Sequence, residues 1–273
     1  MLSFPKIAFL VFLFFILGIH PIWAKVKPNK PFVYNPKLWT RLMKNHRSSY
    51  QNKTSEGQVV QKLKHKFPHL SDQFLAYFPP GYKQDVKKKW PTIIFLHGAG
   101  ERGDDIDQVR KNGLPKYLDH IDGFNFLVFS PQCPLGIHWN YPKELHDFLM
   151  ELKELYPIDH HQIYLTGISS GGFGTYEWAF DYPEEFAAIC PVSGGCTLEY
   201  ARKLKNLPIW VFHGALDPVV SIKADQQLVK AFQDWGIPIV FTFFPDGGHD
   251  IWDATYQNPE LYEWFLNHSR KDL

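Results

Sequence analysis

Short apolar runs alternate with longer amphipathic stretches from about residue 71 onward. The short runs are rich in β-branched and aromatic residues, which is typical of strands, whereas apolar residues at three- and four-residue spacing indicate helices. Strands are predicted at 73–78, 92–96, 125–130, 162–166, 187–192, 209–212 and 239–244. Helices are predicted at 108–118, 142–156, 170–181, 222–235 and 259–268. This alternation predicts an α/β fold with mostly parallel strands joined by helices.

The predicted strand 92–96 is apolar along nearly its whole length, as Thr-Ile-Ile-Phe-Leu. A strand of this kind suits a central sheet that is covered by helices on both faces. Ligands of open α/β sheets bind beyond the carboxyl ends of the strands. We therefore expect the residues that carry chemistry to follow the predicted strands directly.

The segment Gly167–Gly172 reads G-x-S-x-G and lies between a predicted strand and a predicted helix. In this context the serine occupies a strained turn, which needs small neighbours so that substrate can approach its hydroxyl. Ser169 is therefore the predicted nucleophile, and the amide of Ser170 is the first predicted oxyanion donor. The rival Ser193 follows Pro191, where the motif requires glycine, and is interpreted as part of a strand-end loop.

A second glycine-rich segment, 97–103, follows the strand 92–96 and begins with His97. Acyl transfer needs a second backbone donor from a loop of this kind. Ala99 is the predicted donor, with Gly100 as the alternative. We expect His97 to hold the loop through its ring rather than to act as a base.

Asp217 and His249 each follow the end of a predicted strand. A buried carboxylate that accepts the imidazole N–H fixes the tautomer of the base and stabilises its protonated form. Asp217 is therefore the predicted orienting acid and His249 the predicted base. Three other carboxylates near the histidine, Asp246, Asp250 and Asp253, are the rivals and are expected to be solvated.

The chain order Ser169, Asp217, His249 is that of the α/β-hydrolase triad. Over about 74–265, the sequence resembles the bacterial esterase and predicted-peptidase branch of that superfamily, which is related to dienelactone hydrolases, polyhydroxybutyrate depolymerases, feruloyl esterases and prolyl-oligopeptidase catalytic domains. The segments that carry the resemblance are 96–105, 130–134 and 248–253. The resemblance implies an α/β-hydrolase fold and an ester or amide hydrolase without a cofactor. Dienelactone hydrolases use cysteine where this chain has Ser169, so their substrate is not carried over.

The expected reaction is covalent acyl transfer, with water releasing the acyl group from Ser169. The expected partner is a small-molecule or polymer-linked carboxylic ester. A serine peptidase of the prolyl-oligopeptidase type and an acyltransferase with the same triad are the alternatives. Trp139 and Trp252 are candidates for a substrate pocket, although core or lid packing explains both equally well. No metal is expected, because His138 and the pair 160–161 lack ligand spacing and are interpreted as loop residues.

The predicted organisation is a signal peptide at 1–24, a basic lead-in at 25–70 and a catalytic domain at 71–273. Lys6 precedes the apolar run 7–19, which is shorter than the roughly 20 residues that span a bilayer, so export with cleavage after Ala24 is expected. Ile22 is bulky for a position near the cut, so an uncleaved anchor is the alternative. The lead-in carries eleven Lys or Arg against one acid; it is expected to be a solvated extension, with contact to an anionic surface as the alternative.

The 273 residues and their 45% hydrophobic content suffice for one sizeable core, and a formal net charge of +1 gives no reason to expect a nucleic-acid partner. In an exported protein the three cysteines, Cys133, Cys190 and Cys196, form one disulfide or remain buried thiols. The sequence does not decide between the two, and it does not determine the oligomeric state.

Overall fold

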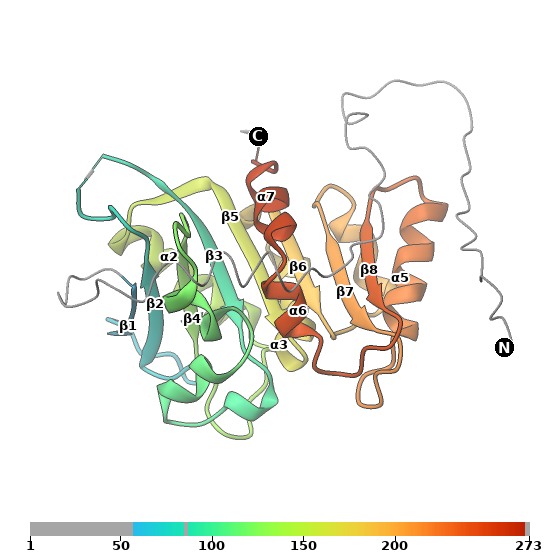
Figure 1. Cartoon of the computed structure of the whole chain (residues 1–273), viewed down its shortest axis with the longest axis horizontal. Coiled ribbons are helices and arrows are strands. Elements are labelled where there is room, and N and C mark those ends of the chain that lie inside the picture. The colour runs from blue at the N-terminus through green and yellow to red at the C-terminus, as the bar shows by residue number, and fades with distance from the viewer. Residues whose placement is uncertain (1–56, 85–86, 271–273) are drawn as a thin grey trace, which may run out of the picture. The chain divides into compact units, whose positions relative to one another are not determined.

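The computed structural model describes residues 57–84 and 87–270, which form one eight-stranded sheet covered by helices (Figure 1). The strand order is β1-β2-β4-β3-β5-β6-β7-β8. The strands are β1 Gly57–Lys62, β2 Gln73–Phe78, β3 Trp90–Leu96, β4 Leu127–Pro131, β5 Ile158–Ile168, β6 Ala188–Val192, β7 Trp210–Gly214 and β8 Val240–Phe244. The β1–β2 and β2–β4 pairs are antiparallel and the other neighbours are parallel. The predicted mostly parallel sheet is confirmed.

The helices are α2 Pro142–Leu155, α3 Ser170–Asp181, α4 Leu198–Ala201, α5 Lys223–Asp234, α6 Trp252–Tyr256 and α7 Pro259–Leu266. Figure 1 shows α6 and α7 in front of the middle strands of the sheet. Four of the five predicted helices match α2, α3, α5 and α7 to within a few residues. Among the described residues, no helix is long and apolar enough to cross a membrane.

The prediction of a helix at 108–118 is wrong. The chain instead makes three short 3₁₀ turns, η2 Ile106–Lys111, η3 Leu114–Lys116 and η4 Leu118–His120. Gly113 separates the first two with a φ of 65°, and a Cβ at this position would lie 2.4 Å from the ring of Phe95. Pro115 then lacks the N–H that a continuous helix would use. The segment therefore has the apolar spacing of a helix, but its backbone cannot form one continuous helix.

The sheet also begins earlier than the predicted domain boundary at residue 71. The last part of the basic lead-in forms β1, which pairs with β2 from Gly57 opposite Phe78 to Lys62 opposite Gln73. Residues 64 and 65 then donate their amides to the Glu151 carboxylate on α2. The predicted signal peptide and the lead-in up to residue 56 lie outside the described residues.

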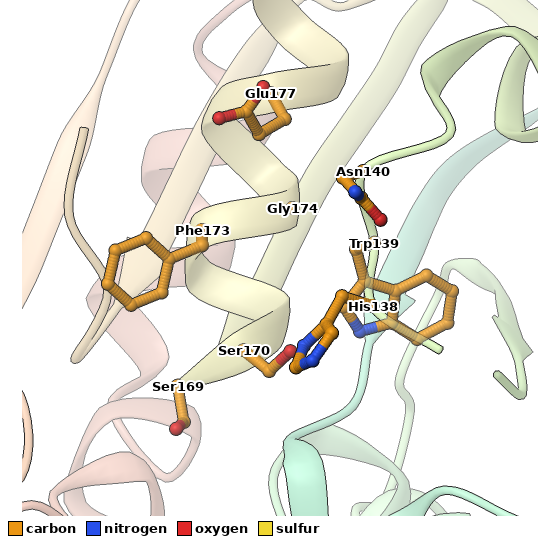
Figure 2. Close-up of a pocket in the computed structure, with 8 residues that line it drawn as sticks. All are labelled: His138, Trp139, Asn140, Ser169, Ser170, Phe173, Gly174 and Glu177. Carbon is orange, nitrogen blue, oxygen red and sulfur yellow. The ribbon is translucent and has the colours of Figure 1, made fainter. Parts of the chain in front are cut away.

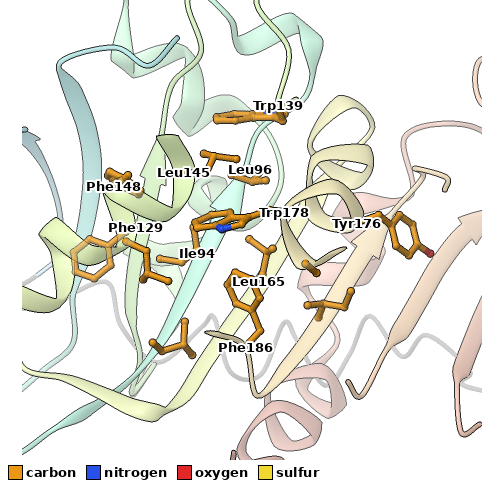
Figure 3. Close-up of a cluster of buried hydrophobic side chains, with 14 of the residues drawn as sticks. Ile94, Leu96, Phe129, Trp139, Leu145, Phe148, Leu165, Tyr176, Trp178 and Phe186 are labelled. Carbon is orange, nitrogen blue, oxygen red and sulfur yellow. The ribbon is translucent and has the colours of Figure 1, made fainter. Parts of the chain in front are cut away.

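Two hydrophobic clusters lie on the opposite faces of the sheet. Strand β3 divides between them, because side chains alternate along a strand. Ile94 and Leu96 join the cluster under α2, α3 and α5 (Figure 3), whereas Ile93 and Phe95 join the cluster under α6 and α7. Helices therefore cover both faces, as predicted, and the carboxyl ends of the parallel strands are held at one edge of a rigid core.

All three cysteines are free thiols, so the disulfide alternative does not apply to this structure. Cys133 and Cys190 are buried and Cys196 is half-buried. Burial raises the pKa of the Cys133 thiol to about 12 and also raises the pKa of Cys190. The three side chains act as small apolar groups in the core.

Replacement of Phe148 by alanine tests the core under α2. The ring is fully buried and makes an edge contact with Phe74, their centroids lying 5.6 Å apart. Its loss leaves a cavity, so the free energy of unfolding should fall by about 3–5 kcal/mol in urea titrations. Phe243→Ala on β8 is the control, because that ring is 53% exposed. Equal losses in the two variants would contradict the core described above.

Candidate active site

Ser169 occupies a sharp turn between the end of β5 and the start of α3. Its φ of 52° and ψ of −114° are unusual for a residue with a side chain, and its amide donates to Val192 O at 2.9 Å. A Cβ at Gly171 would lie 2.0 Å from Leu96 O, and one at Gly167 would lie 2.4 Å from Gly171 O. The glycines of the motif are therefore required because the backbones of β3, β5 and α3 meet here without space for side chains.

The structure brings Ser169, His249 and Asp217 into one hydrogen-bonded chain. Ser169 Oγ lies 2.8 Å from His249 Nε2, and His249 Nδ1 lies 2.7 Å from Asp217 Oδ2. The three residues follow β5, β7 and β8 at the carboxyl edge of the sheet. Of the rival acids, Asp253 pairs with Lys116 at 2.6 Å. The geometry fits a nucleophile, a base and an acid that orients the base.

The Asp217 side chain is fully buried and is held as an acceptor. Its Oδ1 accepts the amides of Val219 at 2.8 Å and Val220 at 2.9 Å. Burial opposes ionisation, but the hydrogen bond from His249 and these two amides outweigh it and lower the pKa of the carboxyl below its usual value. The carboxylate is thus charged at neutral pH, so His249 Nδ1 donates to it and Nε2 is left to accept the serine proton.

Ser193, the rival serine, also has a positive φ, of 47°. Its hydroxyl donates to the backbone oxygen of His249 at 2.9 Å, whereas the ring nitrogens of His249 contact Asp217 and Ser169. Ser193 therefore supports the loop that carries His249. Its role in the structure is thus a hydrogen bond to the loop beside the candidate site.

The two predicted oxyanion donors lie on adjacent segments. Ser170 is the first residue of α3, ahead of the first helical hydrogen bond, in which the amide of residue 173 donates to Ser169 O at 3.1 Å. Ala99 opens a 3₁₀ turn, Ala99–Glu101, and its carbonyl accepts a hydrogen bond from Arg102 Nε at 2.8 Å. The close approach of Gly171 to Leu96 places the start of α3 against the strand that leads into this turn.

His97 holds the loop between β3 and the 3₁₀ turn through both ring nitrogens. Nδ1 lies 2.6 Å from Gly98 O, and Nε2 accepts from the amide of Cys133 at 3.0 Å. Burial lowers the pKa of this histidine to about 4, so the ring is neutral. Trp139 Nε1 donates to His97 O at 2.8 Å. The geometry agrees with the expected structural role of His97.

A pocket of about 310 Å³ lies beside Ser169 (Figure 2). One wall is the face of α3 that begins at Ser170, and the segment 138–140 forms the opposite wall. The lining residues are His138, Trp139, Asn140, Ser169, Ser170, Phe173, Gly174 and Glu177. Trp139 is in this lining, but it is also only 3% exposed and belongs to the core cluster under α2 and α3, so the structure fits both interpretations of this residue. Trp252 is not in this lining; its ring contacts His249 edge-on, at 5.5 Å between centroids.

Five lining residues were not predicted from sequence: His138, Asn140, Phe173, Gly174 and Glu177. Ser170, Phe173, Gly174 and Glu177 follow the spacing of one helix face, which is the signal that would have found the residues on α3. His138 and Asn140 flank Trp139 and carry no comparable signal, because only the folded loop brings them opposite α3.

No metal site accompanies this pocket in the part of the chain that the structure describes, where no three His, Cys, Asp or Glu side chains converge. The sequence interpretation of residues 160 and 161 as loop histidines is wrong, because both lie within β5. They are exposed there, on a strand that extends four residues further toward its start than predicted.

The fold is similar to that of a solved esterase structure. The chain aligns with a thermostable esterase at a TM-score of 0.67 and 29% identity, over 78% of this chain and 63% of that chain. A family model described as phospholipase/carboxylesterase matches residues 141–260. The chain belongs to the α/β-hydrolase superfamily. The resemblance noted in the sequence is thereby confirmed.

Curated relatives of this α/β-hydrolase are ester hydrolases. A bifunctional acetylxylan esterase/xylanase of Neocallimastix patriciarum is 30% identical over 150 residues, covering 53% of this chain and 22% of the relative. A poly(3-hydroxyoctanoate) depolymerase of Pseudomonas fluorescens is 25% identical over 210 residues, covering 66% of this chain and 74% of the relative. The chain thus spans about a fifth of the first relative. The curated relatives and the solved structure are thus named as ester hydrolases or a depolymerase.

Gly171→Ala tests the contact that forms the Ser169 turn. The new Cβ would meet backbone atoms of Leu96 that cannot rotate away, so the free energy of unfolding should fall by about 2–3 kcal/mol or more. Gly100→Ala is the matched control, because a Cβ there meets nothing within 4 Å. Chemical denaturation of both variants measures the difference, and a stable Gly171→Ala protein would show that the two backbones are not tightly apposed.

Proposed function

We propose that the protein hydrolyses carboxylic esters through an acyl-enzyme, with Ser169 as nucleophile, His249 as base and Asp217 as the residue that orients the base. The observation that carries the proposal is the hydrogen-bonded chain from Asp217 through His249 to Ser169, with distances of 2.7 and 2.8 Å. Its position beside a pocket in an esterase-type hydrolase supports the same conclusion.

In the first half-reaction His249 Nε2 accepts the Ser169 proton while Oγ attacks the ester carbonyl carbon. The carbonyl oxygen becomes an oxyanion and is stabilised by the amides of Ser170 and Ala99. When the tetrahedral intermediate collapses, the protonated His249 gives its proton to the departing alkoxide, and the acyl group stays on Oγ. Water then attacks the acyl-enzyme in the same way and releases the acid.

The substrate class we propose is a small or polymer-linked ester. The pocket volume of about 310 Å³ suits a compact acyl or aryl group, and the exposed ring of Phe173 supplies apolar surface in the lining. Two curated relatives are named as an acetylxylan esterase and a poly(3-hydroxyoctanoate) depolymerase, which supports esters carried on polymers. Trp252, beside His249, is proposed to contact bound substrate.

Export is part of this proposal and rests on the first 24 residues. Lys6 followed by an apolar run and by Ala24 is the layout of a signal peptide. Sequencing of the amino terminus of the protein recovered outside the cytoplasm tests it: a mature chain that begins at Lys25 supports cleavage, and one that begins at Met1 contradicts it.

Ser169→Ala is the direct test of the nucleophile. Hydrolysis of a p-nitrophenyl ester series should fall on the order of a millionfold in kcat. A fluorophosphonate probe should label the parent protein and not this variant. Ser193→Ala is the matched control; it removes only the brace on the His249 loop, so labelling should persist. Labelling that persists in Ser169→Ala and disappears in Ser193→Ala would reverse the assignment.

Asp217→Asn tests the orienting acid. The amide lacks the charge and favours the wrong tautomer of His249, so kcat should fall on the order of 10³–10⁴-fold. Asp253→Asn is the control for the rival acid, because that carboxylate pairs with Lys116 at the surface. If Asp253→Asn shows the larger loss, the acid has been assigned to the wrong residue. Adding an alcohol acceptor to the same assay separates hydrolysis from acyl transfer by the products formed.

A further inference from the structure

A second histidine contacts the same carboxylate as His249. His213 lies in β7, is fully buried, and its Nε2 forms an ion-pair contact of 3.2 Å with Asp217 Oδ2. The same nitrogen lies 2.9 Å from Val220 O. Asp217 Oδ2 therefore lies between Nδ1 of His249, at 2.7 Å, and Nε2 of His213.

The partners of His213 determine where its protons are. A backbone carbonyl only accepts, so Nε2 carries a hydrogen that it donates to Val220 O. Nδ1 lies 2.6 Å from Asp225 Oδ2, and the Tyr176 hydroxyl donates to Asp225 Oδ1 at 3.0 Å. Burial raises the pKa of Asp225, although its hydrogen bonds with His213 and Tyr176 oppose this rise, so one proton is shared between Nδ1 and Asp225 Oδ2. With that proton on Nδ1, Asp225 accepts at both oxygens and His213 is an imidazolium.

The charged surroundings agree with this state. Two carboxylates, Asp217 and Asp225, face the His213 ring, and Tyr176 and Cys196 are the other titratable groups near Asp225. Burial lowers the pKa of His213, but the hydrogen bonds to Asp225 and Val220 O and the charges of both carboxylates outweigh it and raise the pKa above its usual value. Figure 3 shows the Tyr176 hydroxyl pointing away from the labelled core side chains, and Tyr176 and Asp225 come from α3 and α5.

We propose that His213, held as an imidazolium by Asp225, is a positioning residue of the proposed active site that holds Asp217 Oδ2 by its charge at 3.2 Å. This inference rests on the proposed function. The contact fixes the carboxylate in the orientation that receives His249. The positive charge also weakens the pull of Asp217 on a proton at His249, so the base remains free to accept the Ser169 proton at lower pH than it otherwise would.

Two neutral replacements of His213 separate its two contacts. The side-chain amide of asparagine reaches the position of Nδ1 and keeps the contact with Asp225, whereas that of glutamine reaches the position of Nε2 and keeps a donor toward Asp217. Asp225→Asn is nearly isosteric; it lets neutral His213 keep a hydrogen on Nε2 while removing the carboxylate that holds the charge. Comparison of melting temperatures first identifies the variants that are folded.

The first readout is the pH profile of kcat/KM on a p-nitrophenyl ester. His213→Asn should raise the acidic midpoint by about 0.5–1 pH unit and lower kcat about tenfold, with KM within twofold. Asp225→Asn should move the midpoint in the same direction, and His213→Gln should lose less kcat than His213→Asn. An unmoved midpoint in every folded variant, or equal losses in the two His213 replacements, would overturn the proposal in favour of a purely structural pair.

The second readout does not need activity. In ¹⁵N-histidine-labelled Ser169→Ala protein, both ring nitrogens of His213 should be protonated at pH 7, with His213→Asn identifying the signal. A singly protonated ring at pH 7 would overturn the proposal. The two failures are distinguishable: a parent protein that hydrolyses no ester contradicts the proposed function, whereas an active parent with a neutral His213 contradicts this inference alone.

Discussion

The start of α3 rests on the end of β3 with no side chain between the two backbones. Gly171 makes this approach possible, because any Cβ there would lie 2.0 Å from the carbonyl oxygen of Leu96. Ser169, two residues before Gly171, has a positive φ of 52° in the turn that leads into this contact, and it lies at the edge of the sheet. The contact also sets the start of the helix beside the loop that contains Ala99. The nucleophile turn and both proposed oxyanion donors thus depend on a single backbone packing.

The same helix defines the pocket. Gly174, one turn further on, lets Trp139 approach so closely that a Cβ there would lie 2.3 Å from the Trp139 Cβ. Trp139 is in turn fixed by its hydrogen bond to His97 O, and His97 by its bonds to Gly98 and Cys133. The wall opposite α3 is therefore anchored to the loop of the proposed oxyanion donor, so the pocket and the reacting centre keep a constant relative geometry.

The free-energy cost of burying a carboxylate explains the groups that surround Asp217. Asp217 is removed from water, and an unpaired charge in that position would neutralise itself by binding a proton. Two amides satisfy one oxygen, and two histidines contact the other. His213 brings a proposed positive charge to this group. Its other ring nitrogen contacts Asp225, which also accepts a hydrogen bond from Tyr176. A line of paired polar groups thus runs from Ser169 through the sheet edge to α5.

The sequence alone determined the strand and helix pattern, the turn at Ser169 and the residues that follow β7 and β8, because apolar periodicity and glycine requirements are local properties of the chain. Tertiary structure decided the rest. It paired the mixed polar and apolar segment Gly57–Lys62 with β2 as an added strand, and it broke the helix predicted at 108–118 where Gly113 meets Phe95. It also assembled His138, Phe173 and Glu177 into one pocket, and set His213 against Asp217. These outcomes depend on contacts between segments far apart in the chain, which no local pattern records.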